Sequence, residues 1–539
     1  METAAKKRSA KKAEGDGECR EMVTFVIPGT GIPSVGRSKK PNFNTKGETV
    51  LRKLAGQTAI YGISSIAARL LNYMLTPYLT RIMTTGEYGV ITDLYALIPF
   101  VMILLTMGME TGYFRFAGHA ATEGEKRNVF QTAWGAVTAV SVVFLAAVVL
   151  FYRDIAGAMG YGATPSYVWI VGTIIALDAV TAIPFAKLRE ENRAMRYVAV
   201  RVSTVALNVI LCIFFYSGLP YIGLLSALWS PEYGAGYYLV SNLAASFLAL
   251  LLLWPAYRGY RPRIDRRLFR TIFLYSLPLL ISGVAGVANE FIDRQFIKYL
   301  MPSQIAMSSL GIYGAVVKIA VIMMLFVQMY RLAAEPFFLS GFKRDEFKRT
   351  NAEAMKYFMI VSVFVFLLIA LFSDFFALII GADFRQGIYI LPVVLLANIF
   401  SGAVLNLSFW YKQTGKTKFA IVITGTGLLV TVGLNLLLIP RMGFIGAAWA
   451  RLGCEFTMAA VSYALNQRYY KTPYDLRRIG FYFLVGGLLY GIGLVAARLD
   501  TGVLRALIDL ALIGAFVETV RRKERIDTGA LLRQLVKRK

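Results

Sequence analysis

Charged side chains inside long apolar segments are the residues whose chemistry is most informative in this sequence. Arg69, Arg294 and Lys318 each lie in a mostly apolar run of about 20 residues, the length that spans a bilayer. An ionised side chain at the centre of such a helix costs on the order of 2.5 to 3.5 kcal/mol, so it normally faces a bundle interior or a watery cavity. Guanidinium and ammonium groups bind diphosphate oxygens by charge-assisted hydrogen bonds. These three cations are therefore the candidate site for a diphosphate.

Carboxylates share the same segments as these cations. Glu290 lies four residues before Arg294, and Glu335 lies four residues after Arg331, so each pair can meet on one helix face. Two interpretations stay open: ion pairs that hold helices together, or carboxylates that bind a coupling proton or sodium ion. On the second interpretation the candidate cation sites are Asp93, Glu110, Glu290, Asp293 and Glu335.

The composition restricts the class of protein. The chain has 539 residues, of which 57% are hydrophobic and 17% charged, and its net charge is +26. A soluble or disordered chain of this length would need more polar surface. His119 is the only histidine and there are three cysteines, so the sequence indicates no metal site, cofactor or histidine-dependent catalysis. The expected class is an all-α polytopic membrane protein.

Apolar runs separated by short polar connections predict about 14 transmembrane helices. The predicted spans are 55–80, 88–112, 129–151, 166–187, 197–217, 236–256, 272–298, 306–332, 355–375, 388–411, 419–439, 443–466, 479–498 and 502–520.

The distribution of Lys and Arg predicts the orientation. The six connections after even-numbered helices carry 25 of the 58 basic residues, whereas the seven connections after odd-numbered helices carry 7. Basic residues collect in cytoplasmic connections, so both termini are expected to be cytoplasmic. The positive charge is thereby accounted for by topology, and no nucleic-acid partner is expected.

An internal repeat predicts two lobes. A shift of 225 residues aligns Arg69 with Arg294, Glu110 with Glu335, and seven identities in all over 47 positions. Six helices separate the copies, so the lobes would be related by a pseudo-two-fold axis along the membrane normal. The predicted parts are a disordered basic extension (1–50), an N-lobe (51–256), a C-lobe (257–478), two extra helices (479–520) and a basic cytoplasmic tail (521–539).

Short motifs around the first two predicted helices, and a corresponding segment in the eighth, resemble one family. Residues 76–81 (TPYLTR), 87–89 (EYG), 108–115 (GMETGYFR) and 311–314 (GIYG) are similar to the polysaccharide-transporter branch of the multidrug/oligosaccharidyl-lipid/polysaccharide exporter superfamily. The resemblance implies two six-helix lobes, a cationic central cavity, and no enzymatic activity. It also implies transport of an undecaprenyl-diphosphate-linked oligosaccharide, such as an O-antigen, capsule or exopolysaccharide repeat unit.

The expected protein is thus a multi-pass flippase of the bacterial inner membrane, with the lipid-linked oligosaccharide and the bilayer as partners. Proton or sodium coupling and association with polysaccharide polymerase or assembly enzymes are further expectations. Two alternatives stay open. One is a drug or cation antiporter of the same superfamily, and the other is a membrane-embedded glycosyl polymerase or ligase, although no sizeable outer loop or metal-binding carboxylate motif is evident.

Overall fold

The structure is a computed structural model that describes residues 73–222, 226–227, 229–339, 344–416, 418–499 and 502–525. By its contacts the chain divides into residues 1–54 and 55–539, and every element below belongs to the second unit. The predicted extension (1–50), Arg69 and most of the predicted C-terminal tail lie outside the described residues.

The described residues form helices and contain no strand. A helix that is described over 73–82 comes first. The following helices are α3 (Thr85–Thr106), α4 (Met109–Gly118), α5 (Glu123–Ala158), α6 (Ser166–Glu190), α7 (Ala194–Ile213), α8 (Gly236–Leu252), α9 (Trp254–Tyr257), α10 (Arg266–Leu300), α11 (Ser303–Leu339), α12 (Arg344–Leu371), α13 (Ser373–Ala377), α14 (Leu391–Gln413), α15 (Lys418–Met442), α16 (Phe444–Tyr469), α17 (Leu476–Leu499) and α18 (Val503–Lys523). The short helical turns are η1 (Phe214–Gly218), η2 (Leu219–Tyr221), η4 (Pro231–Tyr233) and η5 (Ala382–Ile390).

The predicted fold class is confirmed as an all-α polytopic membrane protein. Ten helices in the described part of the chain are long and apolar enough to cross a membrane. The remaining predicted spans overlap the helix at 73–82, α8, α16 and α18. Each predicted span therefore overlaps helix within the described residues, while residues 55–72 of the first span lie outside them. α18 is 21 residues long and carries Arg505, Asp509 and Glu518, so it is not among these ten helices, although its apolar run predicts the span 502–520.

The second predicted span, 88–112, is divided in the structure. α3 ends at Met107, which has a φ of 50°, and α4 begins after Gly108, which has a φ of 69°. The left-handed conformation costs little at a glycine, so Gly108 permits the break. A capping box between Thr84 and Glu87 fixes the other end of α3.

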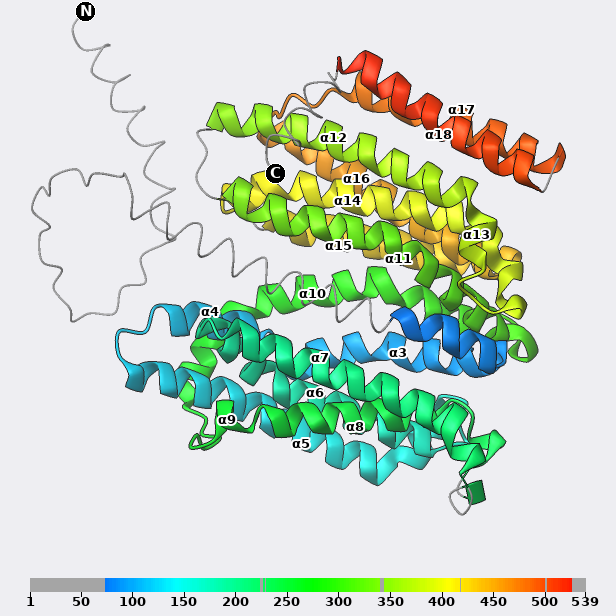
Figure 1. The fold of residues 1–539 in the computed structure, drawn as a ribbon. Helices are drawn as coiled ribbons and strands as arrows, with labels where there is room; N and C mark the ends of the chain where they lie inside the picture. The colour runs from blue at the N-terminus through cyan, green and yellow to red at the C-terminus, as the bar shows by residue number, and fades with distance from the viewer. Residues whose placement is uncertain are drawn as a thin grey trace, which may run out of the picture. The chain divides into compact units, whose positions relative to one another are not determined.

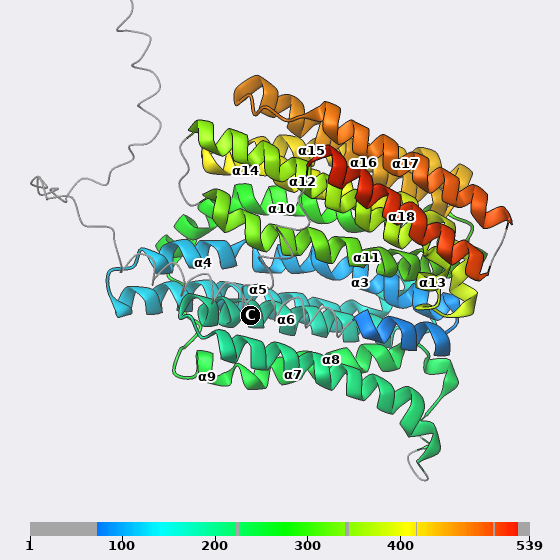
Figure 2. The same ribbon diagram turned by 45° about the horizontal axis from the view of Figure 1, so that its top comes forward.

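The helices pack as two groups with α3, α10 and α11 at the boundary (Figure 1). In the first group α6 packs against α5 and α8, and α7 packs against α8. In the second group α16 packs against α14 and α15, and α14 also contacts α11 and α12. α3 lies against both α10 and α11, while α17 and α18 pack together on α12 (Figure 2). The exact lobe boundaries at 256/257 and 478/479 stay predictions.

The two ends of the bundle are named by their connections. The basic face is the end that carries the α4–α5, α6–α7, α9–α10, α11–α12, α14–α15 and α16–α17 connections, where the basic residues gather. The opposite face carries the α5–α6, α10–α11 and α17–α18 connections.

The first half of α10 packs against the first helix group near the basic face. Asp265 caps this helix by accepting hydrogen bonds from the backbone N–H groups of Arg267 and Leu268. The Leu268 bond holds the pKa of Asp265 below its ordinary value of 3.8, with a further contribution from the Asn128 amide. Arg115 on α4 lies 4.4 Å from the centre of the Tyr275 ring on α10.

α3 and α11 cross at very short range near the opposite face. A Cβ atom on Gly89 would lie 1.9 Å from the Met307 carbonyl oxygen, and one on Gly311 would lie 1.9 Å from the Thr85 carbonyl oxygen. The hydroxyl oxygens of Thr85 and Ser308 are 2.6 Å apart at the same crossing. Glycine is therefore required at both positions for the two helices to meet.

Candidate functional site

Two of the three predicted cations line one cavity. This cavity, called the central cavity here, has a volume of about 110 Å³. Its walls come from the helix at 73–82, α3, α8, α10 and α11, and they include Arg294 and Lys318. The third predicted cation, Arg69, lies outside the described residues. Its role stays a prediction, made from its position inside the apolar span 55–80 and from its alignment with Arg294 in the repeat.

Arg294 is held in place by its own helix. Its Nη1 atom donates to Oδ1 of Asp293 at 2.9 Å and to the backbone carbonyl of Glu290 at 2.7 Å. Tyr313 on α11 donates its hydroxyl to the other Asp293 oxygen. Arg294 is only 8% exposed, and its guanidinium carbon lies 4.9 Å from the centre of the Phe291 ring. The ionic partner is thus the adjacent Asp293, and Glu290 contributes its carbonyl oxygen.

Lys318 lies between two different environments. It faces the central cavity and also an apolar cavity of about 310 Å³. Among the described residues that line the apolar cavity, Lys318 is the one that is charged, and the others include side chains such as Met74, Ile322 and Leu325. The Lys318 ammonium lies 5.1 Å from the centre of the Tyr73 ring. A ligand with an anionic group and a hydrocarbon chain could satisfy both environments at this position.

Asp93 joins α3 to α10. It is fully buried and accepts hydrogen bonds from Gln295 at 2.7 Å and Lys298 at 2.5 Å, as well as from the Tyr161 hydroxyl. The side chain of Lys298 is 9% exposed. This buried ion pair joins two helices at the boundary between the groups, and Lys298 is not among the sequence candidates.

The other candidate carboxylates are dispersed. Glu110 on α4 pairs with Arg189 on α6. Glu335 on α11 pairs with Arg331 at 3.0 Å, as its spacing allows, and with Lys412 on α14 at 2.7 Å. The structure therefore brings Asp293 to the cations of the central cavity and does not bring the five carboxylates to one place.

α16 carries a buried arginine that is incompletely paired. Arg451 is 7% exposed, and its Nε and Nη1 atoms have no hydrogen-bond partner among the residues that the structure describes. Glu455, one turn further along α16, and Glu290 and Asp293 on α10 interact with it electrostatically. The sequence shows that Arg451 lies inside a predicted span. It does not show that Glu290 and Asp293 lie nearby, because these two residues belong to a different helix, α10.

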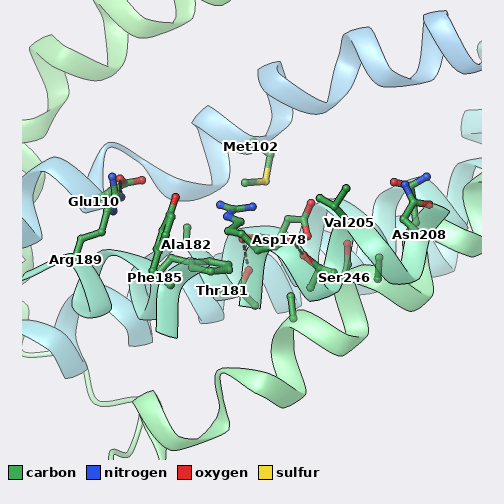
Figure 3. A pocket seen from close by; sticks show the side chains of 16 residues that line it. Met102, Glu110, Asp178, Thr181, Ala182, Phe185, Arg189, Val205, Asn208 and Ser246 are labelled. Carbon is green, nitrogen blue, oxygen red and sulfur yellow. Dashed lines mark hydrogen bonds and ion pairs between the residues drawn. The ribbon is translucent and has the colours of Figure 1, made fainter. Parts of the chain in front are cut away.

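A second polar cavity lies within the first helix group (Figure 3). This cavity, called the N-lobe cavity here, has a volume of about 360 Å³ and is lined by α3, α4, α6, α7 and α8. Its walls contain Asp178 and Arg201, ionisable residues of the predicted spans 166–187 and 197–217. Glu110 is the one sequence candidate among the described residues that line this cavity. Asp178 and Arg201 lie outside the repeated helices that supply the candidates, although an intramembrane carboxylate on the fourth helix is itself a usable signal.

Among the residues that the structure describes, no group of three or more His, Cys, Asp or Glu side chains could hold a metal ion. Cys212 and Cys454 are buried free thiols.

Comparisons with known proteins give a family and a fold. The protein-family model described as "Polysaccharide biosynthesis protein" matches residues 54–342. No curated protein matches the chain.

The fold is similar to that of solved transporters. One is the lipid II flippase MurJ in an inward closed conformation, with a TM-score of 0.66 and 14% identity, covering 87% of this chain and 100% of that chain. A second is the inward-facing conformation of a MATE family multidrug resistance transporter of the MOP superfamily. It has a TM-score of 0.61 and 14% identity, covering 74% of this chain and 94% of that chain. A third is the MATE multidrug transporter DinF-BH, with a TM-score of 0.56 and 15% identity, covering 80% of this chain and 99% of that chain. At these identities the similarity shows the fold alone.

Proposed function

The chain belongs to the polysaccharide biosynthesis protein family, and on that premise we propose that it is a flippase for an undecaprenyl-diphosphate-linked oligosaccharide. It would carry an O-antigen, capsule or exopolysaccharide repeat unit across the bacterial inner membrane by cation-coupled alternating access. It would act as a transporter and not as an enzyme. The basic face would be cytoplasmic, because Lys and Arg concentrate in cytoplasmic connections.

The position of Lys318 carries this proposal. Lys318 and Arg294 put two positive charges on the central cavity, and none of the described residues that line this cavity is a carboxylate. The apolar cavity begins at the same lysine. A diphosphate bound by the two cations would leave its prenyl chain beside an apolar wall, which suits an amphipathic anion. Arg69 would complete the set, as the repeat partner of Arg294.

Asp293 offers a route for cation coupling. Its carboxylate holds the Arg294 guanidinium at 2.9 Å, so a proton or sodium ion that neutralised Asp293 would release Arg294 to bind the diphosphate. The other candidates for coupling are Asp93, Glu110, Glu290 and Glu335. Asp93 is already neutralised by Lys298, which favours a structural role for that carboxylate.

The experiment is a measurement of leaflet accessibility in vesicles that contain the purified protein and a lipid-linked oligosaccharide, with and without an ion gradient. Alanine at Arg69, Arg294 or Lys318 should lower the affinity for the diphosphate roughly tenfold to hundredfold, because each removes charge-assisted hydrogen bonds. Lys416→Ala is the control, since Lys416 is exposed in the α14–α15 connection and lines none of these cavities. Full flipping by all three cavity variants would refute the site.

The same vesicles test the antiporter alternative. A lipophilic cation entering the central cavity would meet Arg294 and Lys318, and none of the described lining residues is a carboxylate that could bind it. The neighbouring Asp293 is already paired with Arg294. Uptake of such a cation against a proton or sodium gradient, together with failure to move the lipid-linked oligosaccharide, would favour an antiporter. Sugar incorporation by the purified protein would instead favour a polymerase or ligase.

A further inference from the structure

The N-lobe cavity has the lining of a binding site, and the proposed diphosphate site does not use it. It runs along the helices, from Glu110 and Arg189 at one end to Asn208 at the other (Figure 3). On α7 its lining extends from Tyr197 to Asn208, which at 1.5 Å per residue is roughly 16 Å along the helix axis. Its volume of about 360 Å³ lies within the range of about 300 to 1,000 Å³ that is typical of small-molecule sites.

The charges in this cavity compensate one another. Glu110 forms an ion pair with Arg189. Asp178 accepts a hydrogen bond from Ser246 and interacts electrostatically with Arg201. The Arg201 guanidinium also stacks on Phe185, with its central carbon 4.1 Å from the ring centre. Two carboxylates and two guanidiniums leave the described lining without net charge, so the cavity does not select for a free anion or a lipophilic cation.

The uncharged polar groups favour a ligand with many hydroxyls. Asn208 and Asn242 bring carboxamides. Hydroxyl groups come from four further residues, which are Thr181, Tyr197, Thr204 and Ser246. Amide and hydroxyl groups each both donate and accept hydrogen bonds, as sugar hydroxyls do. The Thr181 and Thr204 hydroxyls donate to carbonyls of their own helices, which leaves their oxygen lone pairs to accept from a ligand.

The N-lobe cavity adjoins the central cavity. The α8 side chains that line the two cavities follow a single face of the helix: Tyr238 lines the central cavity, and Asn242, Ala245 and Ala249 line the N-lobe cavity. This spacing of three and four residues keeps them on one stripe. Tyr238 and Tyr95 of α3 both line the central cavity, with their ring centres 5.3 Å apart. Tyr95 also interacts electrostatically with Asp178, which lines the N-lobe cavity, so this pair of rings lies on the side of the central cavity that is nearest to the N-lobe cavity.

We propose that the N-lobe cavity is a glycan subsite, which binds sugar residues of the substrate while Arg294 and Lys318 hold its diphosphate. The inference rests on the proposed function and deepens it. Each of the three cavities then matches one chemical part of the ligand. The neutral, hydroxyl-bearing N-lobe cavity would take the glycan, the central cavity with its two cations would take the diphosphate, and the apolar cavity would take the prenyl chain. Tyr95 and Tyr238, on the side of the central cavity nearest to the N-lobe cavity, must move or rotate to admit a glycan attached to the diphosphate.

The test compares two ligands bound to the full chain in lipid nanodiscs: undecaprenyl diphosphate that carries an oligosaccharide, and undecaprenyl diphosphate alone. Asn208→Leu and Asn242→Leu remove carboxamides at similar volume. Each should weaken binding of the glycan-bearing lipid about twofold to tenfold, the effect of one hydrogen bond, and leave binding of the bare lipid unchanged. Arg294→Ala should weaken binding of both ligands. Unchanged affinity for the bare lipid also shows that each asparagine variant is folded.

Asn435→Leu is the matched control. Asn435 on α15 donates to the Thr431 carbonyl four residues earlier at 2.7 Å, as Asn242 donates to the Tyr238 carbonyl at 2.9 Å, but it lies outside the cavity. The control should bind both ligands like the wild type.

Two outcomes overturn the subsite while the proposed function stands. In one, the asparagine variants affect both ligands equally or neither, and Arg294→Ala still weakens both. In the other, Asp178→Asn abolishes binding of a lipophilic cation dye and leaves glycan binding unchanged. If the wild-type protein binds neither lipid, the proposed function fails and the glycan subsite fails with it.

Discussion

Replacing Gly311 with alanine should prevent α3 and α11 from closing together near the opposite face. The new Cβ atom would lie 1.9 Å from the Thr85 carbonyl oxygen. Carbon and oxygen atoms in contact between helices are about 3.3 to 3.6 Å apart, so the helices must separate by roughly 1.5 Å. That displacement would break the 2.6 Å contact between the Thr85 and Ser308 hydroxyls. Overpacking of this kind costs about 1 to 3 kcal/mol, which corresponds to a roughly fivefold to hundredfold lower population of the closed arrangement.

Disulfide formation between Thr85→Cys and Ser308→Cys measures this population. The cross-link should form readily with glycine at 311 and much more slowly with alanine, and flipping should slow in parallel. Gly433→Ala is the control, because nothing lies within 4 Å of its added Cβ and both substitutions share the same gain in helix propensity. Equal cross-linking rates in the Gly311→Ala variant and its glycine parent would refute the reasoning.

Three further predictions concern charged groups. Lys298→Ala should destabilise the protein by about 3 to 5 kcal/mol, because it leaves Asp93 buried without its countercharge. Adding Asp93→Asn to this variant should restore part of the lost stability, as measured by thermal unfolding. The changes in the free energy of unfolding caused by Arg451→Met and Glu455→Gln should be non-additive, with a coupling energy of about 0.5 to 3 kcal/mol in a double-mutant cycle. Additive changes would show that the two side chains do not interact. The pKa of Asp265 is lowered in the folded state, so its stabilising contribution is complete above pH 3.8 and is lost as the pH falls through the lower folded-state pKa. The difference in melting temperature between the wild type and Asp265→Asn should therefore shrink in acid, and a pH-independent difference would contradict this.

The helices of this protein could be predicted because membrane spans have a local cause. About 20 apolar residues are needed to cross the hydrocarbon core, and within the described residues each predicted span overlaps a helix. The break between α3 and α4 could not be predicted in this way, because an apolar run has the same hydropathy whether or not it bends. Met107 and Gly108 adopt left-handed conformations that composition does not encode.

The candidate site was predicted in part. An unpaired cation in an apolar segment must find a polar environment, and this physical requirement led to Arg294 and Lys318. It did not identify Asp293 as the partner of Arg294, since the spacing pointed to Glu290. Of the four charged residues in the described lining of the N-lobe cavity it identified Glu110 alone, because Asp178, Arg189 and Arg201 lie outside the repeated helices.

The sequence by itself determined the all-helical membrane fold, the positions of the described spans, and the presence of cations such as Arg294 and Lys318 inside them. These features depend on local hydropathy and charge, which each segment carries irrespective of its neighbours. Only the tertiary structure decided that Lys318 stands between a cationic and an apolar cavity, that Asp93 pairs with Lys298, and that five helices enclose a neutral polar cavity. Those features arise where residues far apart in the chain come within a few ångströms, and packing between helices sets those distances.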